Sequence, residues 1–145
     1  MNNYFIDTSA LFKRYIPEPG TDELDNILNQ EGIFYISELS IIEVISNLKR
    51  KNEISGEINE ELYEKIKSEF FNDIAEEKIR TARISSDTII EAINIIDQNY
   101  VTPIDSLQLS AAVQIKSEWG NVVFICSDEK LGNLAEKHGL EVLII

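Results

Sequence analysis

The chain has 145 residues, of which 43% are hydrophobic and 27% charged, and its formal net charge is -13 at pH 7. This length predicts one domain, spanning residues 1–145, that buries a core without help from disulfides or a structural metal. One cysteine and one histidine exclude an internal disulfide and a Cys/His zinc cage. The acidic balance argues against a simple electrostatic nucleic-acid binder, whose charge would be basic.

Strands and helices are predicted to alternate along the chain. The apolar residues Tyr4 to Ile6 predict a first strand, and Thr8 to Tyr15 a short helix that ends before Pro17. Thr21 is predicted to cap a second short helix. The next predicted elements are a strand over 33–36, a helix opened by Ser37, and a helix over about 57–71 that forms a hairpin with it. Residues 75–84 fit either an extension of that helix or a strand.

The last third of the chain repeats the alternation. Ser85 or Ser86 caps an amphipathic helix with Ile89, Ile90, Ile93 and Ile96 on one side. Thr102 and Pro103 begin another, in which the small residues 110–112 allow close packing against a neighbour. An apolar strand over 122–125, a helix to Lys137 and a closing strand EVLII follow. These elements predict a three-layer α/β/α fold, with a parallel sheet of about four to five strands and helices on both faces.

Four of the acidic residues are distinguished by their positions. Asp7 and Asp128 each follow a predicted strand, Asp105 lies in the first turn of a helix, and Glu43 lies inside the apolar run IIEVI. Each has a structural interpretation: the three aspartates as helix caps, and Glu43 as part of a solvated helix face. Because ligands bind open α/β folds at the carboxyl ends of the strands, the set as a whole favours a shared site.

The four acids lie in segments that resemble the PIN domain, most closely the small VapC-like toxins of prokaryotic toxin–antitoxin pairs. YFIDTSAL looks like the opening strand and first acid of that family, LSIIEVISNL like the helix with the second, PIDSLQLSAA like the third and FICSDEKL like the fourth. Within DTS, Ser9 matches the second polar position of the family. The family usually has Ser or Thr where this chain has Cys126, and Ser127 is the candidate substitute.

This resemblance implies a metal-dependent endoribonuclease that hydrolyses RNA phosphodiester bonds. Crowded carboxylates repel and recruit a cation, and oxygen ligands suit Mg²⁺ or Mn²⁺. We expect Asp7 and Asp128 to bind the metal most directly, with Asp105 as a ligand or a water-mediated partner. Glu43 would orient or deprotonate the attacking water. The competing hypothesis is a PIN-like module that binds a protein partner and catalyses nothing.

The resemblance also implies a homodimer and a cognate antitoxin protein. Lys13, Arg14 and Arg50 are candidates for RNA contact, although cations at helix ends also stabilise the helix dipole. For the pair Lys13 and Arg14, and for Arg50 with its neighbouring lysines, the helix-dipole interpretation is favoured when each is taken alone. With no apolar run long enough to span a bilayer and no leader-like start, the protein is expected in the cytoplasm without a membrane partner.

Overall fold

Five parallel strands form one sheet at the centre of the molecule. The computed structural model describes residues 1–145. In the sheet the strands lie in the order β3-β2-β1-β4-β5. Their bounds are β1 Asn2–Ile6, β2 Gly32–Ser37, β3 Arg80–Ala82, β4 Val122–Cys126 and β5 Glu141–Ile144. The predicted parallel sheet is confirmed, and its first strand, β1, lies in the middle.

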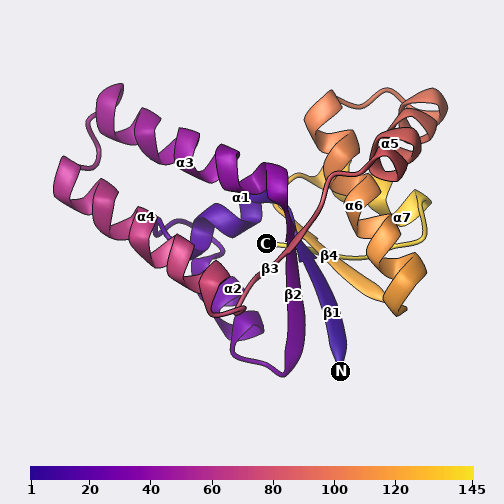
Figure 1. The fold of residues 1–145 in the computed structure, drawn as a ribbon, viewed down its shortest axis with the longest axis horizontal. Helices are drawn as coiled ribbons and strands as arrows, with labels where there is room; N and C mark the ends of the chain where they lie inside the picture. Colours follow the sequence, from indigo (N-terminus) through magenta and orange to yellow (C-terminus); the bar gives the residue numbers. More distant parts are fainter.

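Helices cover both faces of this sheet, which confirms the three-layer α/β/α fold (Figure 1). One layer consists of α1 Thr8–Leu11, a 3-10 turn Phe12–Arg14, α2 Thr21–Leu28, α3 Glu38–Glu53 and α4 Glu60–Ala75. The other consists of α5 Ser86–Gln98, α6 Pro103–Trp119 and α7 Glu129–Lys137. The pair α3 and α4 forms the predicted hairpin on the left of Figure 1. No helix combines the length with the apolar character that a membrane-spanning segment requires.

The two cores follow from the alternation of side chains along the buried strands. Tyr4 and Ile6 of β1 enter the core beneath α1 to α4, and Phe5 enters the core beneath α5 to α7. Phe5 stacks on Phe124 of β4, with ring centroids 5.8 Å apart. Because β1 is buried on both faces, its end is held rigidly where Asp7 follows it.

Most of the predicted helix starts are confirmed. Ser37 caps α3, Ser85 caps α5 and Thr102 caps α6, each through its side-chain oxygen. The prediction for Thr21 is wrong, because Gly20 is the N-cap of α2 with a φ of 101°. The Thr21 hydroxyl instead donates to the carbonyl of Lys13 (2.8 Å) and ties the preceding loop together.

The undecided middle of the chain contains parts of both proposed elements. Helix α4 continues to Ala75, and after a turn through Glu77, at a φ of 58°, the chain forms the short strand β3. β3 pairs with β2 at the edge of the sheet, with Tyr35 opposite Arg80. A three-residue strand leaves no alternation from which periodicity could identify it.

The isoleucine side of α5 faces outward, against the expectation for an amphipathic helix. Ile89, Ile90, Ile93 and Ile96 are between 37% and 57% exposed. The opposite side, with Thr88, Ala92 and Ile95, is buried against α6. There the Ser110 hydroxyl donates to the carbonyl of Thr88 (2.6 Å), so the predicted small residues of α6 do allow close packing. The helix is amphipathic, but its more hydrophobic side has no partner within the chain.

Candidate active site

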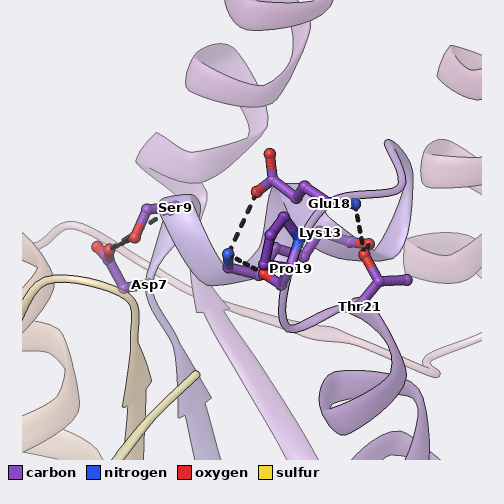
Figure 2. Close-up of polar contacts among 6 residues, drawn as sticks. All are labelled: Asp7, Ser9, Lys13, Glu18, Pro19 and Thr21. Atoms are coloured by element: carbon purple, nitrogen blue, oxygen red, sulfur yellow. Dashed lines mark hydrogen bonds and ion pairs between the residues drawn. The ribbon is translucent and has the colours of Figure 1, made fainter.

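Asp7 lies directly after β1, at the edge where the parallel strands end. Its backbone N–H donates to the carbonyl of Ile125 over 2.9 Å, which joins β1 to β4 at this point. The side chain is 6% exposed, and its Oδ2 accepts hydrogen bonds from Ser9 Oγ (2.7 Å) and Ser9 N (3.4 Å). Figure 2 shows this pair at the start of α1. Asp7 therefore caps α1 with one oxygen and keeps Oδ1 free of hydrogen bonds within the chain.

The pKa values of Asp7 and Asp105 reflect the acids around them. Burial, together with the charges of Asp105 and Glu43, raises the pKa of Asp7 from 3.8 to about 6 in spite of the hydrogen bonds from Ser9. Burial also raises the pKa of Asp105, as does the charge of Asp128, against a hydrogen bond with Thr102. Each acid thus lies within the field of at least one other, and Asp7 is the most deeply buried.

Glu43 reaches this edge from α3. Its Oε1 accepts hydrogen bonds from Thr8 Oγ1 (2.8 Å) and Gln108 Nε2 (3.1 Å). Ser40, one turn earlier, is fully buried. The solvated-face interpretation is therefore wrong for this part of α3, which instead packs its polar residues against α1 and α6.

Asp105 and Asp128 lie at the starts of two helices beside a shallow depression of about 330 Å³. Asp128 caps α7, with its Oδ1 accepting from the backbone N–H of Lys130 (2.8 Å), and is exposed. Asp105 is half-buried in the first turn of α6. Tyr100 and the Lys130 side chain line the same depression, so an aromatic ring and a cation flank the two acids. A larger depression of about 420 Å³ contains none of the four acids.

The donor atoms at this edge are oxygens. No group of three or more His, Cys, Asp or Glu side chains is arranged to hold a metal ion by itself. The hydroxyl of Ser127, next to Asp128, is buried and has no hydrogen-bond partner. A buried hydroxyl without a partner is uncommon and indicates a place for a further polar group or ligand.

Comparison with known families identifies the fold. A model of the PIN domain family matches residues 4–137, a range that contains all four acids. The chain belongs to the PIN domain family. PIN domains are in general nucleases, so at this coarse level the chain is a nuclease-type protein. No curated protein matches the sequence.

Among solved structures, the chain is similar to one described as a domain of a functionally unknown protein from Methanocaldococcus jannaschii DSM 2661. The TM-score is 0.54 at 16% sequence identity, over 100% of this chain and 91% of that one. At this identity the likeness shows a shared fold alone.

Cys126 occupies the position where PIN domains usually have a hydroxyl. The side chain is fully buried and its Sγ donates to the backbone carbonyl of Asp128 (3.4 Å). Burial, followed by the charges of Asp7, Asp128 and Asp105, raises the pKa of the thiol to about 12. The thiol is therefore a protonated group that supports the turn carrying Asp128 in this PIN domain.

The three cations proposed from the sequence differ in their surroundings. Lys13 is 8% exposed, donates to the carbonyl of Pro19 (2.6 Å) and pairs with Glu18 (3.5 Å), away from the Asp7 and Ser9 pair in Figure 2. Arg14 donates to Asp73. These contacts favour the structural interpretation for both residues.

Arg50 is the exposed member of the set. It lies in the last turn of α3 and donates to Asn47 Oδ1 (3.2 Å) one turn earlier. Arg50 therefore keeps both interpretations, as an RNA contact and as a helix-end cation.

Several polar residues next to the acids were not singled out from the sequence. Thr8, Ser40 and Gln108 form a buried cluster with Glu43, and Lys130 lines the depression beside Asp128. The sequence could have pointed to Gln108, because it is a polar residue inside the apolar stretch LQLSAA of a buried helix. The sequence did not point to Lys130, because an exposed lysine in the first turn of a helix is unremarkable.

Proposed function

We propose that this PIN domain is a metal-dependent endoribonuclease that hydrolyses RNA phosphodiester bonds at the site formed by Asp7, Glu43, Asp105 and Asp128. The observation that carries the proposal is Asp7: a carboxyl group buried at the end of the central strand, in the field of two other acids. The ionised form of such a group is costly to bury, and perturbed acids of this kind concentrate at functional sites. Family membership supports the nuclease class.

The residues present fit a hard divalent cation. Mg²⁺ is commonly held by one or two carboxylates with several waters, so a cage of three protein ligands is not required. Asp7 Oδ1 makes no hydrogen bond within the chain, and Ser127 Oγ is buried without a partner. We assign Asp7 and Asp128 as the most direct ligands of Mg²⁺ or Mn²⁺, with Asp105 as a ligand or a water-mediated partner. When bound, the ion would activate water and offset charge on the scissile phosphate.

We assign to Glu43 the action on the attacking water. Its Oε1 is held by Thr8 and Gln108, whereas Oε2 makes no hydrogen bond within the chain. A carboxylate anchored by one oxygen can accept a proton from an attacking water through the other. Ser9 fixes the rotamer of Asp7 in the same manner, through Oδ2.

Lys130 and Tyr100, which lie beside Asp105 and Asp128, are the candidate RNA contacts. Lys130 lines the depression next to Asp105 and Asp128, where a lysine side chain can hold a phosphate. Tyr100, also in this depression, is 86% exposed and offers a ring on which a base can stack. These two residues replace Lys13 and Arg14 as the preferred RNA contacts, with Arg50 further away along α3.

The resemblance to VapC-like toxins supports a role in a toxin–antitoxin pair, with a cognate antitoxin as the physiological partner. The net charge of -13 is compatible with a basic antitoxin segment. Mixing the protein with the product of an adjacent reading frame and measuring loss of cleavage would test this role. Continued cleavage in a stable complex would refute inhibition by that partner.

We further propose that the protein is a homodimer and that the isoleucine side of α5 is buried between the two copies. With exposed fractions between 37% and 57%, the four isoleucines and Ile104 offer on the order of 400 Å² of the ~800 Å² per partner that a standard interface buries. A two-fold axis brings the same patch onto itself, so a purely aliphatic face is self-complementary. Light scattering should give a dimer for the wild type and a monomer for Ile93→Asp. A monomeric wild type would assign this face to another protein.

The competing hypothesis, a non-catalytic interaction module, is favoured by the capping roles of Asp7 and Asp128. The deciding experiment is cleavage of a mixed RNA substrate with Mg²⁺ or Mn²⁺, beside EDTA, by the wild type, Asp7→Asn and Asp128→Asn. Asp22→Asn, which changes an exposed acid in the first turn of α2, is the matched control. Metal-dependent cleavage lost in both site variants and kept in the control supports the nuclease. No cleavage under any condition, with no metal binding by calorimetry, supports the module.

A further inference from the structure

Beneath Glu43 lies a closed cluster of polar side chains from three helices. Thr8 of α1, Ser40 of α3 and Gln108 of α6 are at most 5% exposed. Gln108 Nε2 lies 3.1 Å from Thr8 Oγ1, 3.0 Å from Ser40 Oγ and 3.1 Å from Glu43 Oε1. Thr8 Oγ1 is in turn 2.8 Å from both Ser40 Oγ and Glu43 Oε1. Every member of the cluster is therefore linked to Glu43 directly or through one hydroxyl.

The amide of Gln108 is an unusual choice for this buried position. Its NH₂ group has two hydrogens for three nearby oxygens, while its carbonyl Oε1 is buried without a partner. A buried carbonyl left unpaired costs stability, and a leucine or methionine would fill the space without that cost. Turning the amide over would not help, because Oε1 would then face a Glu43 oxygen at the same short distance. The Gln108 amide thus donates a hydrogen bond to the Glu43 carboxylate, while its own carbonyl stays without a partner.

Gln108 also connects Glu43 to the rest of the site. It lies three residues after Asp105 in α6, so both side chains project from the same side of that helix. Thr8 follows Asp7 directly in the chain. The cluster therefore places Glu43 relative to α1, which Asp7 caps, and to α6, which carries Asp105.

We propose that Gln108, together with Thr8, is a positioning residue that holds Glu43 Oε1 so that Oε2 is presented to the attacking water. This inference rests on the proposed ribonuclease function and assigns it a residue outside the four acids. Gln108 itself does not contact substrate. It acts only through Glu43, and this distinguishes it from a polar residue that merely stabilises the core.

That dependence makes a double-mutant cycle the appropriate test. We expect Gln108→Leu to lower kcat for RNA cleavage by 10- to 100-fold and to change KM less than 3-fold, because binding does not involve Glu43. In the Glu43→Gln background the same substitution should change the residual rate less than 3-fold, since the residue through which it acts has gone. An equal loss in both backgrounds would overturn the inference.

A matched control is available two residues further along α6, on another side of the helix. Ser110 is also fully buried and donates to the Thr88 carbonyl, on the side facing α5. Ser110→Ala should lower the urea midpoint of unfolding and leave kcat unchanged. Gln108→Leu should show the opposite pattern, a lower kcat with little change in the urea midpoint, because removing the amide also removes its unpaired carbonyl.

Three further outcomes can be told apart. If Gln108→Leu does not fold, the same cycle is run with Thr8→Val and Glu43→Gln. Thr8→Val removes the other hydrogen-bond donor to Glu43 Oε1 and keeps the side-chain shape. Losses that add in this cycle overturn the inference. If the wild type cleaves RNA, Asp7→Asn does not, and Gln108→Leu cleaves at the wild-type rate, only the positioning role fails. If the wild type does not cleave RNA, the proposed function and the positioning role fail together.

Discussion

Replacing Asp7 by asparagine should make the protein more stable at neutral pH while removing its proposed activity. The pKa of this carboxyl group is raised from 3.8 to about 6 by burial and by neighbouring acids. Because each pKa unit corresponds to about 1.4 kcal/mol, the ionised side chain costs the native state about 3 kcal/mol above pH 6. Asparagine is neutral at every pH, and its amide oxygen can still accept the hydrogen bonds from Ser9. Asp7→Asn should therefore raise the free energy of unfolding by up to about 3 kcal/mol at pH 7.

The sign of the pH dependence follows from the same shift. Between about pH 4 and pH 6 the native state holds this proton more tightly than the unfolded chain, so the contribution of Asp7 to stability falls as the pH rises through that window. Below pH 4 both states are protonated, and the advantage of the variant should vanish. Millimolar Mg²⁺ or Mn²⁺ should stabilise the wild type and leave Asp7→Asn unchanged, because the ion binds the native carboxylate.

Urea unfolding at pH 4, 5, 6 and 7, followed by circular dichroism, measures this difference directly. The exposed-acid variant Asp22→Asn is the control, and its difference from the wild type should stay within about 0.5 kcal/mol throughout. A variant less stable than the wild type at pH 7 would refute the reasoning. A difference that does not change between pH 4 and pH 7 would refute it as well, because the cost would not then come from ionisation.

Two other substitutions and one reagent test the packing of the fold and the burial of Cys126. Tyr15→Phe removes a buried 2.7 Å hydrogen bond to Asp73 and should lower the free energy of unfolding by about 1.5–3 kcal/mol; an unchanged urea midpoint would contradict this. Gly32→Ala places a methyl group 2.8 Å from the Tyr4 ring and should cost about 1–3 kcal/mol by overpacking, seen as a lower melting temperature than that of the wild type. Cys126 should react with iodoacetamide at pH 8 far more slowly in the native protein than in urea, since its pKa is raised to about 12; equal rates would show that it is accessible as a thiolate.

The sheet was largely predictable because its strands are buried on both faces. Residues 4–6, 33–36 and 122–125 are short apolar runs bounded by polar or turn residues, and each lies within a strand. β3 was not predictable, because its three residues RTA are held at the edge by pairing with β2 and contribute no pattern of their own. Pairing with β2, and not the local sequence, makes these three residues a strand.

Helix α5 shows the limit of amphipathic patterns. The isoleucines identify one side of the helix, but hydrophobicity alone does not show which side the fold buries. Here the contact with α6 depends on small and hydroxyl-bearing residues, such as Ser110 and Thr88, that let the two helices approach. The isoleucine side is left exposed.

The candidate site was predictable to the extent that it follows strand ends. Asp7 and Asp128 were found because a parallel sheet brings the residues after its strands to one edge. Glu43 and Asp105 come from helices, where each alone fitted a solvated face or a cap, and the set of four together with the resemblance to PIN domains favoured including them. The cluster of Thr8, Ser40 and Gln108 depends on the mutual placement of three helices, which no local pattern encodes. The catalytic roles of all four acids stay a prediction.

The order of the strands has a consequence for synthesis of the protein. β1 pairs with β4, so Ile6 lies opposite Ile125, roughly 120 positions later in the chain, and contacts of such long range form slowly and late. A growing chain that has reached residue 100 carries Asp7 and Glu43 but neither Asp105 nor Asp128. The proposed four-acid site therefore cannot form until translation is almost complete, so an unfinished chain lacks the activity that we propose for the whole protein.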